Sequence, residues 1–303
     1  MSEPGVRKIP VETPAGTFEV WTRKVGEHPT VKILMLHGGP AATHEYLLPL
    51  EAPLAEAGYE VYFYDQLGSH FSDQPDDVSL WTIERFVDEV EQVRLALGLD
   101  HFVLYGQSWG GLLGIEYALA HPEPLLGLVV SNMMSSVPAY NDYAERVLIP
   151  AVDQDALAAI RRFEATGTTS DPAYEELLVE HYYVDHLCRL PPEEWPEDVV
   201  NAFAHINHAV YDLLNGPSEL GAIGSIKDWD RSGDLSRIEV PTLVMGAEHD
   251  TMDPAHLRWM ADQLPRGCYH HCPEGSHLAM VDDHDAYVEG LLAWLRDLDA
   301  GTA

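Results

Sequence analysis

A serine flanked by glycines is the strongest chemical signal in this 303-residue chain. The pattern Gly-x-Ser-x-Gly occupies residues 106–110, after an apolar run typical of a buried strand and before a small-residue run with helical spacing. In this context it predicts a sharp strand–turn–helix with a strained serine backbone and an exposed hydroxyl. The helix N-terminus favours a developing oxyanion. We therefore interpret Ser108 as a nucleophile, and the alternative is a chance match in a loop.

A serine hydroxyl becomes nucleophilic when a base removes its proton and a carboxylate orients that base. Asp250 follows one expected strand and His277 follows a later one, so the chain order is serine, acid, histidine. The carboxyl ends of parallel strands meet at one sheet edge, which would bring these residues together. We predict Asp250 as the orienting carboxylate and His277 as general base and then acid. The alternatives are Glu248 for the acid and His249, His270 or His271 for the base.

A glycine-rich turn, His-Gly-Gly-Pro at residues 37–40, follows another buried-strand pattern. Acyl transfer needs two N–H donors around the oxyanion, and glycines let the backbone approach it closely. One donor is the residue after the nucleophile, and an HGGG-type loop supplies the other. We assign the oxyanion hole to the N–H groups of Gly39 and Trp109. Gly38 is the fallback donor and would line the substrate site.

Strand and helix patterns alternate along the parts of the chain that carry these residues. Such alternation predicts an α/β fold with a mostly parallel sheet covered by helices on both faces. From about residue 140 to 220 the pattern is helical, which predicts an inserted all-helical cap. We expect core residues 1–134, a cap at 135–235 and core residues 236–303. The expected strands cover residues 17–23, 31–36, 59–64, 101–105, 124–131, 240–246 and 268–272, and the clearest helices cover residues 46–57, 82–97 and 287–298.

The composition excludes several kinds of partner. The net charge is −33, from 50 acidic and 17 basic residues, whereas nucleic acids and anionic membranes require a basic footprint. No apolar run reaches the roughly 18 residues of a membrane span, and residues 1–7 lack a signal-peptide pattern. These observations predict a cytoplasmic protein and leave its oligomeric state open.

The cysteines predict neither a disulfide framework nor a metal site. There are three of them, an odd number, and two flank the sequence Tyr-His-His at residues 268–272. A zinc site there is an alternative, but residues that alternate along a strand point to opposite faces. We therefore expect ordinary strand residues and no metal.

Five segments together resemble those of the proline iminopeptidases, a serine aminopeptidase family with the α/β-hydrolase fold that also contains amino-acid amidases. The resemblance extends from about residue 10 to residue 298. It implies a helical cap over the active site, no cofactor, and removal of an N-terminal residue, often proline, from peptides or amides. The segments are residues 37–40, 65–68, 106–111, 215–219 and 227–230.

In that family, cap and loop carboxylates hold the free α-amino group of the substrate, and the cap carboxylate matches Glu219. A buried ammonium group requires such a partner. The chain departs from the family pattern at Ala41, where glycine is common, and at residues 70–71. It also has Thr251 where a second carboxylate often follows the orienting aspartate, and Asp253 is the nearest substitute. This departure leaves open whether a free amine is required.

Three hypotheses follow. The first is a serine hydrolase that releases N-terminal proline or a small apolar residue from small peptides or amino-acid amides. The second is an amidase or esterase of another small metabolite with the same triad. The third is a binding protein without catalytic activity, which the complete triad and the glycine-rich turn disfavour. The aromatic residues expected near the pocket are Tyr140, Tyr143, Tyr182, Tyr183, Trp195 and Tyr211.

Overall fold

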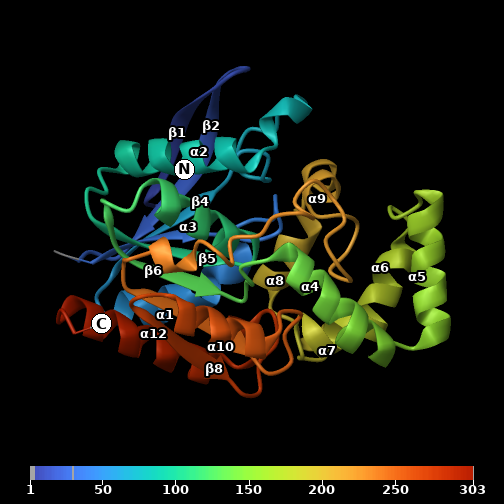
Figure 1. Cartoon of the computed structure of the whole chain (residues 1–303). Coiled ribbons are helices and arrows are strands. Elements are labelled where there is room, and N and C mark those ends of the chain that lie inside the picture. The colour runs from blue at the N-terminus through green and yellow to red at the C-terminus, as the bar shows by residue number, and fades with distance from the viewer. Residues whose placement is uncertain (1–3, 29–30, 303) are drawn as a thin grey trace.

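The computed structural model contains one eight-stranded sheet, with strand order β1-β2-β4-β3-β5-β6-β7-β8 (Figure 1). It describes residues 4–28 and 31–302, so the first three residues of the N-terminal segment lie outside it. The first two strands and the β2–β4 pair are antiparallel, and the other neighbours are parallel. The strands are β1 (Val6–Thr13), β2 (Gly16–Val25), β3 (Lys32–Leu36), β4 (Glu60–Asp65), β5 (Phe102–Gln107), β6 (Leu125–Ser131), β7 (Thr242–Ala247) and β8 (Gly267–Cys272).

The burial of the strands follows their hydrophobic patterns. Residues of β4, β5 and β7 are buried throughout, as expected for central parallel strands with both faces covered. The edge strand β1 lies outside the strands expected from the sequence. Only Ile9 and Val11 of this strand are fully buried, and charged side chains surround them. A half-buried edge strand thus gave too weak an apolar pattern to be recognised.

Helices cover both faces of the sheet, which confirms the expected fold class. Helices α2 (Ile83–Leu97), α3 (Trp109–Ala120) and α10 (Pro254–Gln263) share one hydrophobic core with the sheet, and α1 (Glu51–Glu56), α11 (Ala279–Asp282) and α12 (His284–Asp299) share the other. Figure 1 shows α2 and α12 on opposite sides of the sheet. Helix α2 begins after the N-cap Thr82 and ends at Gly98, where φ is 68°, as the sequence predicted.

The helical pattern expected at residues 46–57 divides into two elements. A 3₁₀ segment covers Glu45–Leu50, and α1 follows it. Pro49 lies inside the 3₁₀ segment. Because proline lacks a backbone N–H, the helical hydrogen-bond ladder is interrupted close to the junction of the two elements.

The chain between β6 and β7 forms a helical layer beside the sheet edge (Figure 1). It has its own hydrophobic core around Ile160 and Tyr182. An isolated antiparallel bridge between Ser136 and Asp230 joins the two ends of this segment. Its helices are α4 (Val137–Tyr143), α5 (Gln154–Thr166), α6 (Pro172–Leu178), α7 (Val184–His186), α8 (Glu197–Ala204) and α9 (His208–Leu214).

Candidate active site

Ser108 stands in the tight turn between β5 and α3. Its backbone has φ 54° and ψ −126°, a conformation that a non-glycine residue adopts only at a strain cost. A Cβ atom at Gly106 would collide with the carbonyl oxygen of Gly110, and one at Gly110 would collide with the carbonyl oxygen of Leu36. The two glycines are therefore required for the crossing of strand and helix, and the crossing holds the serine at the sheet edge.

His277 and Asp250 meet at the same edge, in the loops after β8 and β7. The Nδ1 atom of His277 lies 2.8 Å from Oδ1 of Asp250, and both side chains are buried. Ser108 and His277 line one cavity. The alternative acid, Glu248, is exposed and its carboxylate lies 3.3 Å from Nε2 of His271, at the surface. The structure thus brings together the three residues that the sequence analysis selected.

The environment of His277 suits a base that accepts a proton. Burial by itself would lower the pKa of His277, but the charge and hydrogen bond of Asp250, with a further contribution from Glu219, raise it above the ordinary 6.5. The Asp250 carboxylate therefore favours the imidazolium form of His277.

Asn132 holds the second oxygen of Asp250, a contact that was not expected from the sequence. Its Nδ2 atom donates to Asp250 Oδ2 at 2.7 Å, and its own Oδ1 accepts from the hydroxyl of Ser131 at 2.6 Å. The backbone of Asn132 has φ 50°. A polar residue directly after a buried parallel strand is the signal that could have identified it. Asp250 is thereby fixed from both sides.

The glycine-rich turn is tied to the histidine loop by a chain of hydrogen bonds. The N–H of Gly38 donates to the Tyr46 hydroxyl at 2.5 Å, that hydroxyl donates to Gln107 Oε1 at 2.7 Å, and Gln107 Nε2 donates to the His277 carbonyl at 3.0 Å. Since the N–H of Gly38 is already engaged, Gly39 is the better oxyanion donor. The predicted partner, Trp109, is the first residue of α3, where N–H groups have no intrahelical acceptor.

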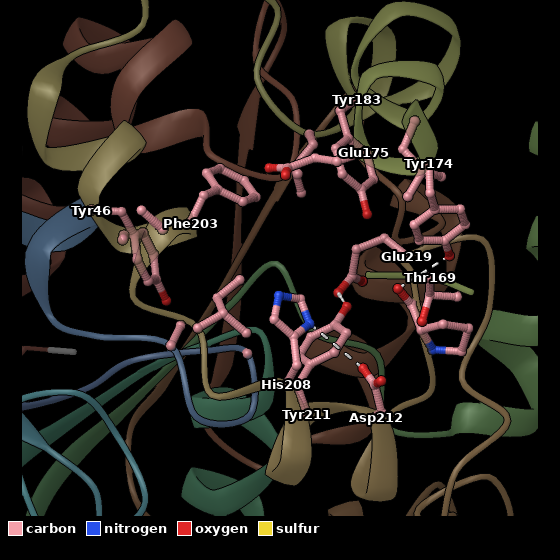
Figure 2. A pocket seen from close by; sticks show the side chains of 18 of the residues that line it. Tyr46, Thr169, Tyr174, Glu175, Tyr183, Phe203, His208, Tyr211, Asp212 and Glu219 are labelled. Atoms are coloured by element: carbon pink, nitrogen blue, oxygen red, sulfur yellow. Dashed lines mark hydrogen bonds and ion pairs between the residues drawn. The ribbon is translucent and has the colours of Figure 1, made fainter. Parts of the chain in front are cut away.

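Glu219 reaches the same cavity from the chain after α9. Its Oε1 accepts from the Tyr211 hydroxyl at 2.5 Å, and its main-chain carbonyl accepts from Tyr140 at 2.6 Å and from Tyr182 at 3.1 Å. Burial raises the pKa of the Glu219 carboxyl above its usual value, although the charge of His277 opposes this shift. Figure 2 shows Glu219 beside Tyr211 within the pocket. A cationic group placed here would relieve the cost of burying the carboxylate.

Thr251, where the family often has a second carboxylate, lies against the His277–Asp250 pair. Its hydroxyl lies 3.1 Å from His277 Nδ1 and 3.3 Å from Asp250 Oδ1, and the residue is fully buried. Asp253, the expected substitute, accepts from the Ala255 N–H as the N-cap of α10. Neither residue is among the described residues that line the cavity, so Asp253 does not stand beside Glu219 as expected.

The cavity between sheet edge and cap has a volume of about 400 Å³, and part of its wall is aromatic (Figure 2). Of the aromatic residues expected there, Tyr183 and Tyr211 line it. Tyr140 borders a smaller recess beside Ser108. Tyr143, Tyr182 and Trp195 pack instead among other cap side chains.

Over the described ranges, no group of three or more His, Cys, Asp or Glu side chains is arranged to hold a metal ion. Cys268 is exposed and Cys272 is buried. Nor is any helix in this part of the chain long and apolar enough to cross a membrane.

Comparison with known proteins identifies the family. A family model described as the alpha/beta hydrolase fold matches residues 32–284. A proline iminopeptidase of Flavobacterium johnsoniae is 47% identical over 96% of this chain and 98% of its own length. Two crystal structures are similar over nearly the whole chain. VinJ has 32% sequence identity and a TM-score of 0.89, and a Mycobacterium smegmatis proline iminopeptidase has 30% sequence identity and a TM-score of 0.86. Each match covers 98% of this chain and 100% of the other chain. The chain therefore belongs to the α/β-hydrolase fold family and, within it, to the proline iminopeptidases.

Proposed function

We propose that this enzyme releases an N-terminal proline or small apolar residue from peptides or amino-acid amides through an acyl-enzyme. The observation that carries the proposal is Glu219. Its carboxylate lines the cavity that also holds Ser108 and His277, and an ammonium group beside it would offset the desolvation that raises its pKa. The names of the relatives point to the same activity.

In the proposed mechanism, the Ser108 hydroxyl attacks the scissile carbonyl carbon while His277 Nε2 takes its proton. Asp250 holds the imidazole through Nδ1 and stabilises its positive charge. The N–H groups of Gly39 and Trp109 stabilise the oxyanion of the tetrahedral intermediate. His277 then protonates the departing amine as the C–N bond breaks, which leaves the acyl group on Ser108. A water molecule, deprotonated by His277, hydrolyses this ester and restores the serine.

A small recess lies beside Ser108. Its volume is about 20 Å³, which is room for about one water molecule, and apolar side chains such as Leu112 and Met133 border it together with Ser108, Gly39 and Glu219. The N-terminal substrate residue would therefore lie in the large cavity, with its amine at Glu219 and its carbonyl at Ser108. The apolar border of the recess would disfavour a charged side chain at this position.

The second candidate is an amidase or esterase without amine recognition, and Thr251 is the observation that favours it. Where the family often supplies a second carboxylate, this chain has a buried hydroxyl that contacts His277. Glu219 alone would then have to bind the amine.

Steady-state kinetics distinguish the two candidates. Proline p-nitroanilide and its N-acetyl derivative would be compared in the wild-type enzyme and in Glu219→Gln, with Ser108→Ala as the blank. The proposal expects turnover of the free amine, little turnover of the blocked substrate, and a loss of about tenfold or more in kcat/KM in Glu219→Gln. Equal turnover of both substrates, or cleavage of p-nitrophenyl esters alone, would establish the second candidate.

A further inference from the structure

We propose that the large cavity, beyond the position of the N-terminal residue, is a leaving-group subsite for a bulky apolar residue, followed by an uncharged or cationic rather than anionic group. This inference rests on the proposed function, because it concerns the part of the substrate that departs when Ser108 is acylated. It goes beyond that function by specifying the second and third residues of the preferred peptide.

The large cavity runs from Ser108 and Glu219 to an exposed border. Glu219 is half-buried, and the recess next to it has room for only about one water molecule. In contrast, Asp171, Glu175 and Asp212 on the border of the cavity are exposed. If the N-terminal residue lies between Ser108 and Glu219, with its amine at Glu219, the remainder of the substrate must extend into the rest of the large cavity, towards these exposed residues.

The size and walls of the large cavity suit an aromatic or large aliphatic side chain. An apolar cavity of about 150 Å³ binds benzene, whereas this one measures about 400 Å³. Phe203 on α8, Leu178 on α6 and Tyr183 contribute apolar surface to it. The rings of Phe203 and Tyr183 stack with 6.3 Å between their centroids. Figure 2 shows both rings at the cavity. Ammonia or glycinamide as leaving group would leave this surface uncovered.

The outer part of the cavity is acidic. Asp171 and Glu175 border it from the α6 side and Asp212 from α9, and all three are exposed. The one imidazole among them, His208, lies 3.7 Å from the Asp212 carboxylate, and the two are drawn together in Figure 2. Among the described residues that line the cavity there is no lysine or arginine. A carboxylate carried by the third substrate residue would therefore be repelled, and an ammonium group would be attracted.

The test uses peptides with a constant N-terminal proline. Pro-Gly-NH2 and Pro-Phe-NH2 have leaving amines of similar basicity, so their comparison isolates the apolar contact. We expect kcat/KM to be about tenfold higher for the phenylalanine peptide, the scale of discrimination that apolar pockets provide. Phe203→Ala should lower this ratio at least threefold. Leu157→Ala is the control, because Leu157 is buried in the cap core and is not among the described lining residues, and it should leave the ratio unchanged.

The charge preference is tested with Pro-Phe-Lys-NH2, Pro-Phe-Gln-NH2 and Pro-Phe-Glu-NH2, which share one leaving residue. We expect kcat/KM to fall in that order, by about fivefold from lysine to glutamate at low salt, and by less at 0.5 M NaCl. Glu175→Gln should reduce the difference. Its neighbour Glu176 is also exposed on α6 but is not among the described lining residues, so Glu176→Gln is the control for the overall negative field.

The outcomes separate this inference from the function on which it rests. Turnover of Pro-Gly-NH2 with equal kcat/KM for the phenylalanine peptide keeps the function and overturns the apolar subsite. Equal effects of Glu175→Gln and Glu176→Gln overturn the acidic outer part as the source of the preference. Failure to cleave any of the free-amine peptides overturns the proposed function and this inference with it.

Discussion

The two walls of the active-site cavity are built in different ways. The wall from the α/β core presents Ser108 and His277, with Asp250 buried behind His277, and hydrogen bonds of 2.7–2.8 Å fix the acid and the base. The opposite wall, from the cap, is mainly aromatic and aliphatic, with exposed carboxylates at its outer part. The reaction requires fixed geometry, and the core supplies it. Selection among substrates depends on shape and charge, and the cap supplies those.

This difference has an energetic basis. Each oxygen of Asp250 has hydrogen-bond donors, so the removal of one donor leaves a buried charge partly unpaired. Apolar contacts in the cap, in contrast, are non-directional and adjust to substitution. Changes in the core wall should therefore lower kcat, and changes in the cap wall should alter KM and substrate preference.

The largest effect is expected for Ser108→Ala. Without the nucleophile, the acyl-enzyme cannot form, and kcat should fall by at least about 10⁴-fold. Labelling with a fluorophosphonate probe, followed by peptide mapping, checks the same residue directly. The wild-type protein should be labelled at Ser108 and the variant should not. Labelling of another residue, or unchanged turnover in the variant, would contradict the role of the core wall.

The second largest effect is the loss of activity in acid. Because the pKa of His277 is raised above 6.5 in the folded enzyme, its neutral form is lost as the pH falls through that raised value. The kcat/KM for proline p-nitroanilide should therefore fall about tenfold per pH unit on the acid side, with a midpoint above 6.5. A pH profile from 5 to 9 measures this. A midpoint below 6.5 would show that Asp250 does not stabilise the imidazolium in this way.

A smaller effect is expected when Asn132 is replaced. Glycine tolerates the positive φ of this position, so Asn132→Gly removes the amide and keeps the backbone. The hydrogen bond to a buried carboxylate is worth about tenfold or more in rate if it positions Asp250. We expect kcat to fall by about that factor while KM changes little. If kcat stays at the wild-type value although the variant is less stable, Asn132 has only a structural role.

The core wall was predictable because its residues follow strands in a fixed order. The strand patterns before Ser108, Asp250 and His277 were recognised in the sequence, and parallel strands present their carboxyl ends at one edge. Asn132 directly follows β6, so the strand pattern could have predicted that it lies at the same sheet edge. Its role was not, because an asparagine after a strand is also a common turn residue.

The cap wall was much less predictable. Tyr183 and Tyr182 are adjacent in one π-helical segment (Val179–Tyr183), yet only Tyr183 lines the cavity. Helical periodicity shows which side chains are apolar, but not whether they face the core of the cap or the substrate. Phe203 was missed for the same reason, since only the packing of cap against core determines what it contacts.

The smallest effect on activity is expected for the cap tyrosines. It tests most directly whether the cap wall affects substrate binding and not the chemical step. Tyr211 donates to the carboxylate of Glu219, and this hydrogen bond lowers the pKa of that carboxyl, opposing the effect of burial. In Tyr211→Phe the pKa of Glu219 should rise further, so the charged form that binds an amine is lost at a higher pH. We expect KM for proline p-nitroanilide to increase about threefold near neutral pH, and more in acid, while kcat stays within about twofold.

Tyr182→Phe is the matched control for this prediction. The hydroxyl of Tyr182 also contacts Glu219, but it donates to the main-chain carbonyl and not to the carboxylate. If Glu219 binds the amine through its charge, this variant should leave KM and its pH dependence nearly unchanged. Equal increases in KM in both variants would mean that the tyrosines only hold the loop in place. A fall in kcat in Tyr211→Phe would mean that the cap also contributes to the chemical step, and the division between the two walls would not hold.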